Sequence, residues 1–157
     1  MATKLHGTSD IYGFFGDLVR CETRLYNLFN DELRERYGLT TAQFEFLRYV
    51  RDHANARVAD IATEFAAGVG AISKGTDRLE RQGLVARRPN PDDRRSAILQ
   101  LTVTGRRLVD DADGYVQTRL RELTAASISP EQLAATSETL ASLRAVLEER
   151  SLGTPTG

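Results

Sequence analysis

The chain is poor in the residue types on which metal sites, redox centres and catalytic triads depend. Its 157 residues contain one cysteine, one methionine, two histidines and no tryptophan. His6 and His53 are too few and too far apart for a metal site, and no carboxylate cluster supplies the missing ligands. No Ser/His/Asp set places a histidine near a nucleophile, and no glycine loop followed by lysine could cradle a phosphate. We therefore expect a protein that is not an enzyme and binds no metal or cofactor.

Long apolar runs, signal-peptide patterns and internal repeats are also missing from the sequence. Without them we expect a cytoplasmic protein that does not enter a membrane. With 41% hydrophobic residues, the chain is one domain-sized unit that can bury a core.

The charges nearly cancel overall but are unevenly distributed along the chain. The net charge of −1 argues against a protein that coats nucleic acid nonspecifically. Residues 74–107 hold nine Lys and Arg against four Asp and Glu, a net charge of +5, whereas residues 108–157 carry −4. A basic block in a near-neutral chain is the electrostatic footprint of a localised DNA contact.

Two short helices are predicted in the middle of the chain. Apolar residues recur at helical spacing over residues 58–65, and the small residues 66–68 follow as a turn. Over residues 69–82, one side of a helical wheel is mainly apolar and the other is polar and basic. The apolar side comprises Val69, Ile72, Thr76 and Leu79. Two helices joined by a tight turn, the second with a basic outer face, form a helix-turn-helix.

The outer face of the second helix holds candidate DNA-reading residues. Small residues at its start would let the backbone come close to the bases, and Ala71 could contact a thymine methyl group. Ser73 and Lys74 can donate to base edges or phosphates, and the arginines further along suit phosphates. The candidates are Gly70, Ala71, Ser73, Lys74, Arg78 and Arg81. A solvated polar face would be the simpler interpretation if this helix stood alone.

A β-hairpin is predicted directly after that helix. Gly83 is the expected C-cap glycine, and strand-like residues 84–88 and 97–102 flank the turn-forming segment 89–96. An arginine at the tip has the reach and fixed charge to enter a minor groove. The candidate wing residues are Asp93, Arg94 and Arg95. A solvated turn with an Asp–Arg pair worth about 0–1 kcal/mol explains the hairpin alone equally well, but the preceding helices favour a DNA-reading winged helix.

Three motifs in this region carry a family resemblance. They are Leu79-Glu80-x-x-Gly83-Leu84-Val85, the Asp93-x-Arg95 of the hairpin tip, and Leu101-Thr102-x-x-Gly105 at the end of the return strand. In order and spacing they resemble the multiple-antibiotic-resistance regulator (MarR) family. The chain departs from the family pattern at Gly68, Gly70 and Gly75.

The resemblance implies a homodimeric, ligand- or oxidant-responsive transcription factor, usually a repressor, that binds a short pseudo-palindrome in double-stranded DNA. By matching position, Asp93 would brace the wing, Arg95 would enter the minor groove and the helix over residues 69–82 would read the major groove.

Amphipathic helices are predicted on both sides of the winged helix. The apolar stripe of the first comprises Ile11, Phe14, Phe15, Leu18, Cys21, Leu25, Leu28, Phe29 and Leu33, and the last repeats Leu133, Leu140 and Leu147 with Leu143 between them. Flanks this long favour a homodimer, whose recognition helices would lie about 34 Å apart. The expected fold is mostly α with a small β-hairpin wing: a single domain over 1–157, with dimerisation helices at 10–37 and 106–150, a winged helix-turn-helix at 41–105 and a flexible tail at 151–157.

The sensing function is less well defined by the sequence. The resemblance to the MarR family implies an aromatic or phenolic effector that binds between the dimer helices and the winged helix. Candidate lining residues here are Phe14, Phe15, Arg20, Tyr26, Phe44, Arg48 and Tyr49. Most of these aromatics fit a plain core position as well.

Two alternative functions remain open. Some members of the family sense peroxide through one cysteine, but the supporting tyrosines are missing here, so we expect a buried, inert thiol at Cys21 and keep a redox-responsive regulator as an alternative. The other alternative is a winged helix that contacts only proteins.

Overall fold

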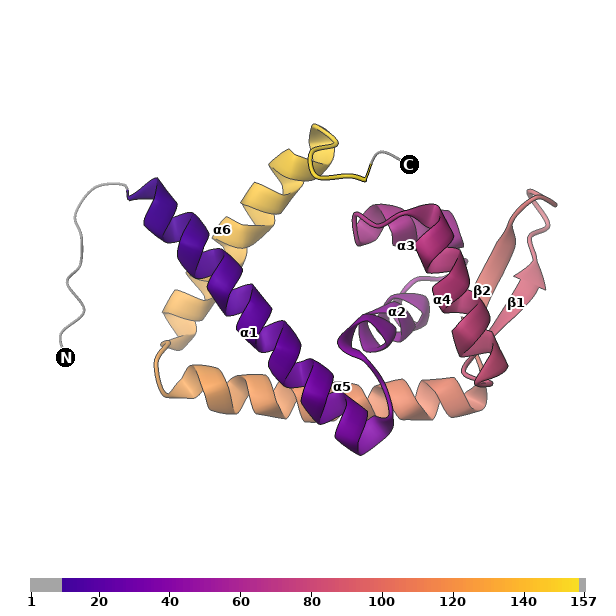
Figure 1. Cartoon of the computed structure of the whole chain (residues 1–157), viewed down its shortest axis with the longest axis horizontal. Helices are drawn as coiled ribbons and strands as arrows, with labels where there is room; N and C mark the ends of the chain where they lie inside the picture. Colours follow the sequence, from indigo (N-terminus) through magenta and orange to yellow (C-terminus); the bar gives the residue numbers. More distant parts are fainter. Residues whose placement is uncertain (1–9, 156–157) are drawn as a thin grey trace. The chain divides into compact units, whose positions relative to one another are not determined.

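A computed structural model describes residues 10–155, which divide into two compact units (Figure 1). The first unit ends at Thr41, and the second begins at Ala42. The second unit contains most of the secondary structure, including the helix-turn-helix and the hairpin. His6 and residues 156–157 of the predicted tail lie outside the described residues.

The first unit is one long helix, α1 (Ile11–Tyr37). Asp10 caps its start, since the Asp10 carboxylate accepts a hydrogen bond of 2.9 Å from the backbone N–H of Gly13. Gly38 ends it with a φ of 67°, and its N–H donates to the carbonyl of Arg34. The predicted helix is confirmed.

Burial along α1 differs from the prediction. Of its residues only Phe29 and Leu33 are buried, whereas most of the apolar stripe before them is exposed. Cys21 is exposed as well, so the prediction of a buried thiol is wrong for this chain. The periodicity correctly shows which side of a helix is apolar, but burial also requires something packed against that side.

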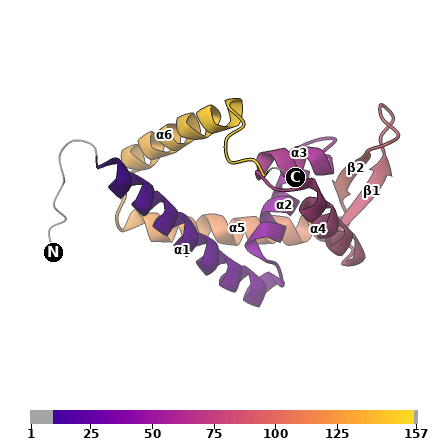
Figure 2. The ribbon, with the colours of Figure 1, turned by 45° about the horizontal axis from the view of Figure 1, so that its top comes forward.

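The second unit is built from short and long helices and one hairpin (Figure 2). Its elements are α2 (Thr41–Asp52), α3 (Val58–Glu64), α4 (Val69–Arg81), β1 (Val85–Pro89), β2 (Ala97–Leu101), α5 (Val103–Ala125) and α6 (Pro130–Glu149). The two strands pair antiparallel, with Val85 opposite Leu101 and Arg87 opposite Leu99. The predicted fold class, mostly helical with a small hairpin, is confirmed.

The core of this unit draws one or more side chains from each element of the winged helix. At most 2% of each of these side chains is exposed: Phe44, Leu47, Ile61, Leu79, Val85, Leu99 and Val109. The backbone N–H of Leu99 also donates to the carbonyl of Ala56 over 2.8 Å, which ties the segment before α3 to the hairpin. Burial of this much apolar surface is the main stabilising contribution to the unit.

Two residues predicted on apolar faces are exposed instead. Val69, the first residue of α4, is 58% exposed, and Phe65, just after α3, is 38% exposed. Both lie next to the turn between the helices, where the chain reverses and no further helical turn covers them. The more central members of the predicted α4 face, Thr76 and Leu79, are buried as expected.

The structure explains why glycine stands at Gly83, in the first family motif, and at Gly105, in the third. Gly83 has a φ of 71° and lets the N–H of Leu84 donate to the carbonyl of Leu79 over 3.0 Å. Thr102 caps α5 by accepting from the N–H of Gly105. A Cβ on Gly105 would lie 2.0 Å from the carbonyl oxygen of Leu84, so only glycine fits there.

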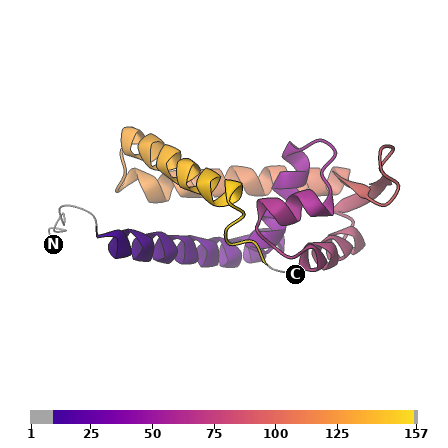
Figure 3. The ribbon, with the colours of Figure 1, turned by 90° about the horizontal axis from the view of Figure 1, so that it is seen from above.

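The C-terminal helix α6 follows α5 after a short loop and folds back from its end (Figures 2 and 3). Ser129 and Gln132 form a capping box at the start of α6, with Pro130 in the first turn. No residue of α6 is buried. Within residues 10–155, no helix has the length and apolar character needed to cross a membrane.

Candidate nucleic-acid interface

The turn between α3 and α4 is built from small residues. Ala66 adopts a φ of 45°, and the N–H of Ala67 donates to the carbonyl of Ala62 over 2.9 Å, which closes the end of α3. Gly68 then stands at the N-cap of α4 and has no side chain to cap it. With Thr76 and Leu79 packed inward, the opposite face of α4 is turned to solvent.

The predicted recognition residues lie on this outward face. Of the six, Ser73 is half-buried, and the exposed ones are Gly70, Ala71, Lys74, Arg78 and Arg81. Among residues 10–155, Lys74 and Arg78 have no hydrogen-bond or ion-pair partner for their side chains, and the Arg81 guanidinium donates only to the backbone carbonyl of Asp77. The charge of these three side chains is therefore available to a ligand.

The wing tip is held in shape by its own polar residues. Asn90 is buried; its side-chain Nδ2 donates to the Ser96 hydroxyl over 2.9 Å, and its side-chain Oδ1 accepts from the backbone N–H of Asp92. The Asp93 carboxylate accepts a hydrogen bond of 2.9 Å from the backbone N–H of Arg95. Hydrogen bonds to the backbone thus hold the tip in shape, and the side chains of Arg94 and Arg95 make none of them.

The two wing arginines are free in the same sense as Lys74. Arg94 and Arg95 are exposed, and within the described part of the chain their guanidinium groups form no hydrogen bond or ion pair. A guanidinium group is positively charged and carries five hydrogen-bond donors. Such a group can enter a narrow groove lined with acceptors.

One groove joins the recognition helix to the base of the wing. Its side chains come from α4, the hairpin and the start of α3, and include Val69, Ser73, Arg57, Arg87, Arg95 and Ser96. The groove therefore brings together a predicted helix residue, Ser73, and a predicted wing residue, Arg95. It also explains the exposure of Val69, which lines it.

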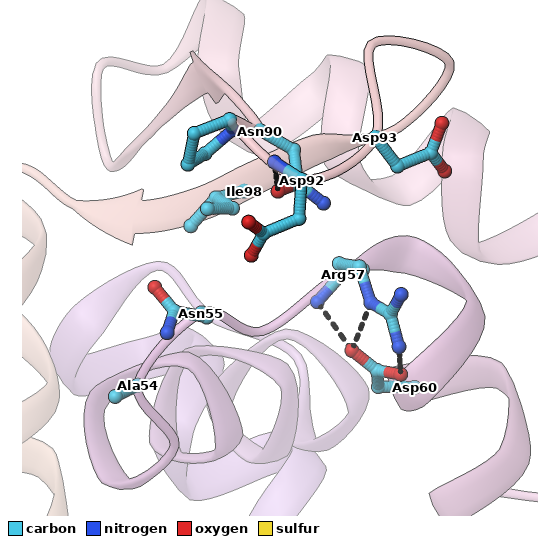
Figure 4. A pocket seen from close by; sticks show the side chains of 9 residues that line it. Ala54, Asn55, Arg57, Asp60, Asn90, Asp92, Asp93 and Ile98 are labelled. Atoms are coloured by element: carbon cyan, nitrogen blue, oxygen red, sulfur yellow. Dashed lines mark hydrogen bonds and ion pairs between the residues drawn. The ribbon is translucent and has the colours of Figure 1, made fainter.

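A second hollow lies behind the wing tip and has the opposite charge character (Figure 4). Asn55, Asp60, Asn90 and Asp92 line it, and the Asp92 carboxylate points into it. Arg57 donates to Asp60 over 2.8 and 3.0 Å, and these hydrogen bonds lower the pKa of the Asp60 carboxyl. Because this hollow contains carboxylates and its one cation is already paired, it is a poor site for an anion such as a phosphate.

Two arginines that line the groove, Arg57 and Arg87, were not among the predicted site residues. Arg57 precedes α3 and its side chain reaches Asp60, a spacing of three residues that is readable as a helix-start pattern. Arg87 lies on β1 and contacts Asp77 and Glu80 on α4. Partial burial alone would lower the pKa of Arg87, but its hydrogen bonds to the two carboxylates outweigh this and raise it. A contact between a strand and a helix leaves no periodic signal.

The residues predicted to line an effector site are divided between the two units. On α1, Phe14, Phe15 and Tyr26 are exposed, and Arg20 pairs with Asp17. On α2, Phe44 is 1% exposed and belongs to the core, Arg48 pairs with Glu45 and Asp113, and the Tyr49 ring stacks on His53 with centroids 3.9 Å apart. An open site can therefore use Phe14, Phe15 or Tyr26 directly, but not Phe44.

Potential metal ligands are scattered. Over residues 10–155, no group of three His, Cys, Asp or Glu side chains gathers closely enough to hold a metal ion.

A helix-turn-helix with a basic outward face, followed by an Arg-bearing hairpin, defines this chain as a winged helix-turn-helix protein. The MarR family profile matches residues 39–97. The chain is 26% identical to the multiple antibiotic resistance protein MarR of Escherichia coli over 134 residues, which cover 83% of this chain and 92% of that protein. It is 36% identical to the HTH-type transcriptional repressor MdtR of Bacillus subtilis over 74 residues, 47% of this chain and 48% of that repressor.

A solved structure agrees with these relatives. The crystal structure of a mutant of E. coli MarR complexed with operator DNA superimposes with a TM-score of 0.68 at 26% identity, covering 86% of this chain and 99% of that one. The chain belongs to the MarR family of transcriptional regulators, as its three motifs predicted.

Proposed function

We propose that this chain is a sequence-specific transcriptional repressor that binds a pseudo-palindromic operator as a homodimer and releases it when an effector binds. In this proposal α4 enters the major groove, with Gly70, Ala71, Ser73 and Lys74 nearest the bases. Arg78 and Arg81 hold phosphates, and the wing reaches the adjacent minor groove. We expect such a repressor to act in the cytoplasm.

The observation that carries the proposal is the set of free cations on the recognition helix and the wing. Lys74 and Arg78 on α4, and Arg94 and Arg95 on the wing, have no side-chain partners among residues 10–155. Other arginines of this unit are occupied by carboxylates, as Arg51, Arg57 and Arg87 are. Cations left unpaired beside a groove support a polyanionic ligand.

The homodimer is supported by the apolar face of α6. Leu133, Leu140, Leu143 and Leu147 share one side of this helix and are each between 37% and 45% exposed. A contiguous apolar seam at heptad-like spacing is typical of a helix that packs against a partner. A symmetric dimer would present two copies of α4 to successive turns of DNA.

The test is fluorescence anisotropy of the purified protein on DNA from upstream of its own gene, against a scrambled duplex, over a series of salt concentrations. We expect nanomolar binding that prefers the native duplex and weakens steeply with salt. Equally weak binding to both duplexes and to other genomic fragments would favour the protein-contact module instead.

We further propose a small aromatic effector, supported by the exposed rings on α1, Phe14, Phe15 and Tyr26. An effector that lowers operator affinity must itself bind more weakly to the DNA-bound protein, by the same factor. A panel of aromatic carboxylates and phenols added to the operator complex tests this. Release of DNA by at least one of them, lost in a Phe15→Ala variant, would support it.

A redox-responsive regulator is the second candidate, because Cys21 is exposed rather than buried. In this alternative, oxidation of the thiol weakens operator binding. Peroxide treatment of the protein and of a Cys21→Ser variant separates the two candidates. A loss of DNA binding in the unaltered protein alone would support the redox mechanism, whereas the same response in both would exclude Cys21.

A further inference from the structure

The outward face of the recognition helix carries two carboxylates among its cations. Asp77 and Glu80 are 54% and 40% exposed at their side chains, so both lie at the surface that the proposed function turns toward DNA. Carboxylates there would repel phosphates. Asp77 is also three residues after Lys74 and four before Arg81, the spacings at which helix side chains pair with one another. Left alone, it could neutralise a cation that the interface needs.

A single guanidinium from the hairpin occupies both carboxylates. Nη2 of Arg87 lies 2.6 Å from Oδ1 of Asp77, and Nη1 of the same group contacts Oε2 of Glu80. The backbone N–H of Arg87 also donates to Oε1 of Glu80 over 3.3 Å. Arg87 is opposite Leu99 in the hairpin, and Leu99 is only 1% exposed, so the strand that carries this guanidinium is anchored in the core.

The consequence is a division of charge on α4. Both carboxylates of its outward face are taken up by Arg87, while Lys74, Arg78 and Arg81 make no ion pair among the described residues. Asp77 contributes only its backbone carbonyl to Arg81. The link also spans two elements that the proposed function sends into different grooves, since α4 carries the helix contacts and β1 leads to the wing tip.

We propose that Arg87 is a positioning residue for DNA binding, which it serves without contacting DNA itself. It holds the recognition helix against the wing and keeps Asp77 and Glu80 from pairing with the helix cations or facing the phosphates. This inference rests on the proposed function, because it assigns a role within the same interface.

A double-mutant cycle on operator affinity tests the inference. The four proteins are the unaltered chain, Arg87→Ala, Asp77→Asn/Glu80→Gln, and the triple variant. We expect Arg87→Ala to weaken binding about tenfold in the unaltered background and less than about threefold once the carboxylates are neutral, since coupled neighbours are not additive. Arg87→Lys keeps the charge but loses the fork that spans two carboxylates, so its affinity should fall between those of the unaltered protein and Arg87→Ala.

Arg88→Ala provides the matched control. Arg88 is the next residue of β1, on the other face of the strand, and has no side-chain partner in the described chain. Removing the Arg88 side chain should lower operator affinity by the same factor with and without the two carboxylates. Thermal melts of all variants show whether each one folds. If Arg87→Ala does not fold, Arg87→Lys takes its place in the cycle.

Three results would overturn the inference. An equal loss from Arg87→Ala in both backgrounds, with a salt slope reduced by about one, would mean that Arg87 contacts a phosphate directly. No loss in either background would mean that the pair is only a surface feature. If the unaltered protein binds no DNA at all, the proposed function itself fails, which the first titration shows before the cycle is begun.

Discussion

The winged-helix segment and the C-terminal helix differ in what they do with their apolar side chains. Every element from α2 to β2 places at least one side chain in the core with no more than 2% of its surface exposed. In α6 no residue is buried, although its leucines recur just as regularly. The same kind of sequence pattern thus produces a completed core in one region and an open apolar face in the other.

The difference shows where the chain is sufficient by itself and where a second molecule is expected. The helices and hairpin of the winged segment cover one another within a short stretch of sequence, so its core is buried without a partner. An amphipathic helix with a bare apolar side is stable when another surface covers that side. The winged-helix segment therefore carries the DNA interface on a core of its own, whereas α6 would pair two copies of the chain.

Breaking the apolar face of α6 should have the largest effect on function. We expect Leu140→Glu/Leu147→Glu to give a monomer whose operator affinity falls by about a hundredfold, because the second half-site no longer adds to binding. Light scattering after size-exclusion chromatography and DNA anisotropy measure the two effects. Ala145→Glu, on the opposite side of α6, is the control and should remain dimeric. A double variant that is still a dimer would place the interface elsewhere.

Breaking the junction between the hairpin and α5 should unfold the self-contained region instead. A Cβ on Gly105 would clash with the carbonyl oxygen of Leu84, so we expect Gly105→Ala to lower the free energy of unfolding by about 3 kcal/mol. Gly114→Ala is the control on the same helix, where a Cβ meets nothing within 4 Å. Urea unfolding followed by circular dichroism distinguishes them, and equal stabilities would show that the junction relaxes freely.

Removing a free cation from the wing should affect the interface without affecting either region's fold. We expect Arg95→Ala to weaken operator binding by about 1–3 kcal/mol and to leave the dimer and the melting temperature unchanged, because its guanidinium has no partner in the described chain. Arg150→Ala removes the same charge just after α6 and serves as the control. Full affinity in Arg95→Ala would exclude the wing from the mechanism.

Adding a side chain at a glycine of the recognition helix should have the smallest effect. Gly75 is helical with open space where a Cβ would stand, so we expect Gly75→Ala to raise the free energy of unfolding by about 1 kcal/mol. Ala71→Gly, in the same helix, should lower it by a similar amount. Thermal melts without DNA measure both changes. An unchanged melting temperature in Gly75→Ala would show that α4 does not limit the stability of the winged segment.

Much of the local structure was predictable because the rules that produce it act within a few residues. Apolar spacing predicted α1, α3, α4 and α6, and Gly83 marked a helix end that the structure has at that place. Turn-forming residues predicted the hairpin tip, and the family motifs located the recognition helix and wing. The recognition and wing residues lie on exposed surfaces of these elements, although their contacts with DNA stay a prediction.

The errors share a different cause, since each depends on what covers a side chain. Cys21 was expected to be buried because it lies on the apolar side of α1, and Val69 because it lies on that side of α4. Phe44 could be a ligand contact or a core residue from its spacing alone, and only packing placed it in the core. A helical wheel contains no information about neighbouring elements.

The order and type of the elements, and the positions of the cations that the interface offers, follow from the sequence because periodicity, capping and turn chemistry are local. Only the tertiary structure decided that Arg87 joins Asp77 and Glu80, that Gly105 must lack a side chain beside Leu84, and that α6 buries no residue. These features depend on how separate elements cross and approach one another in space, which local rules leave open.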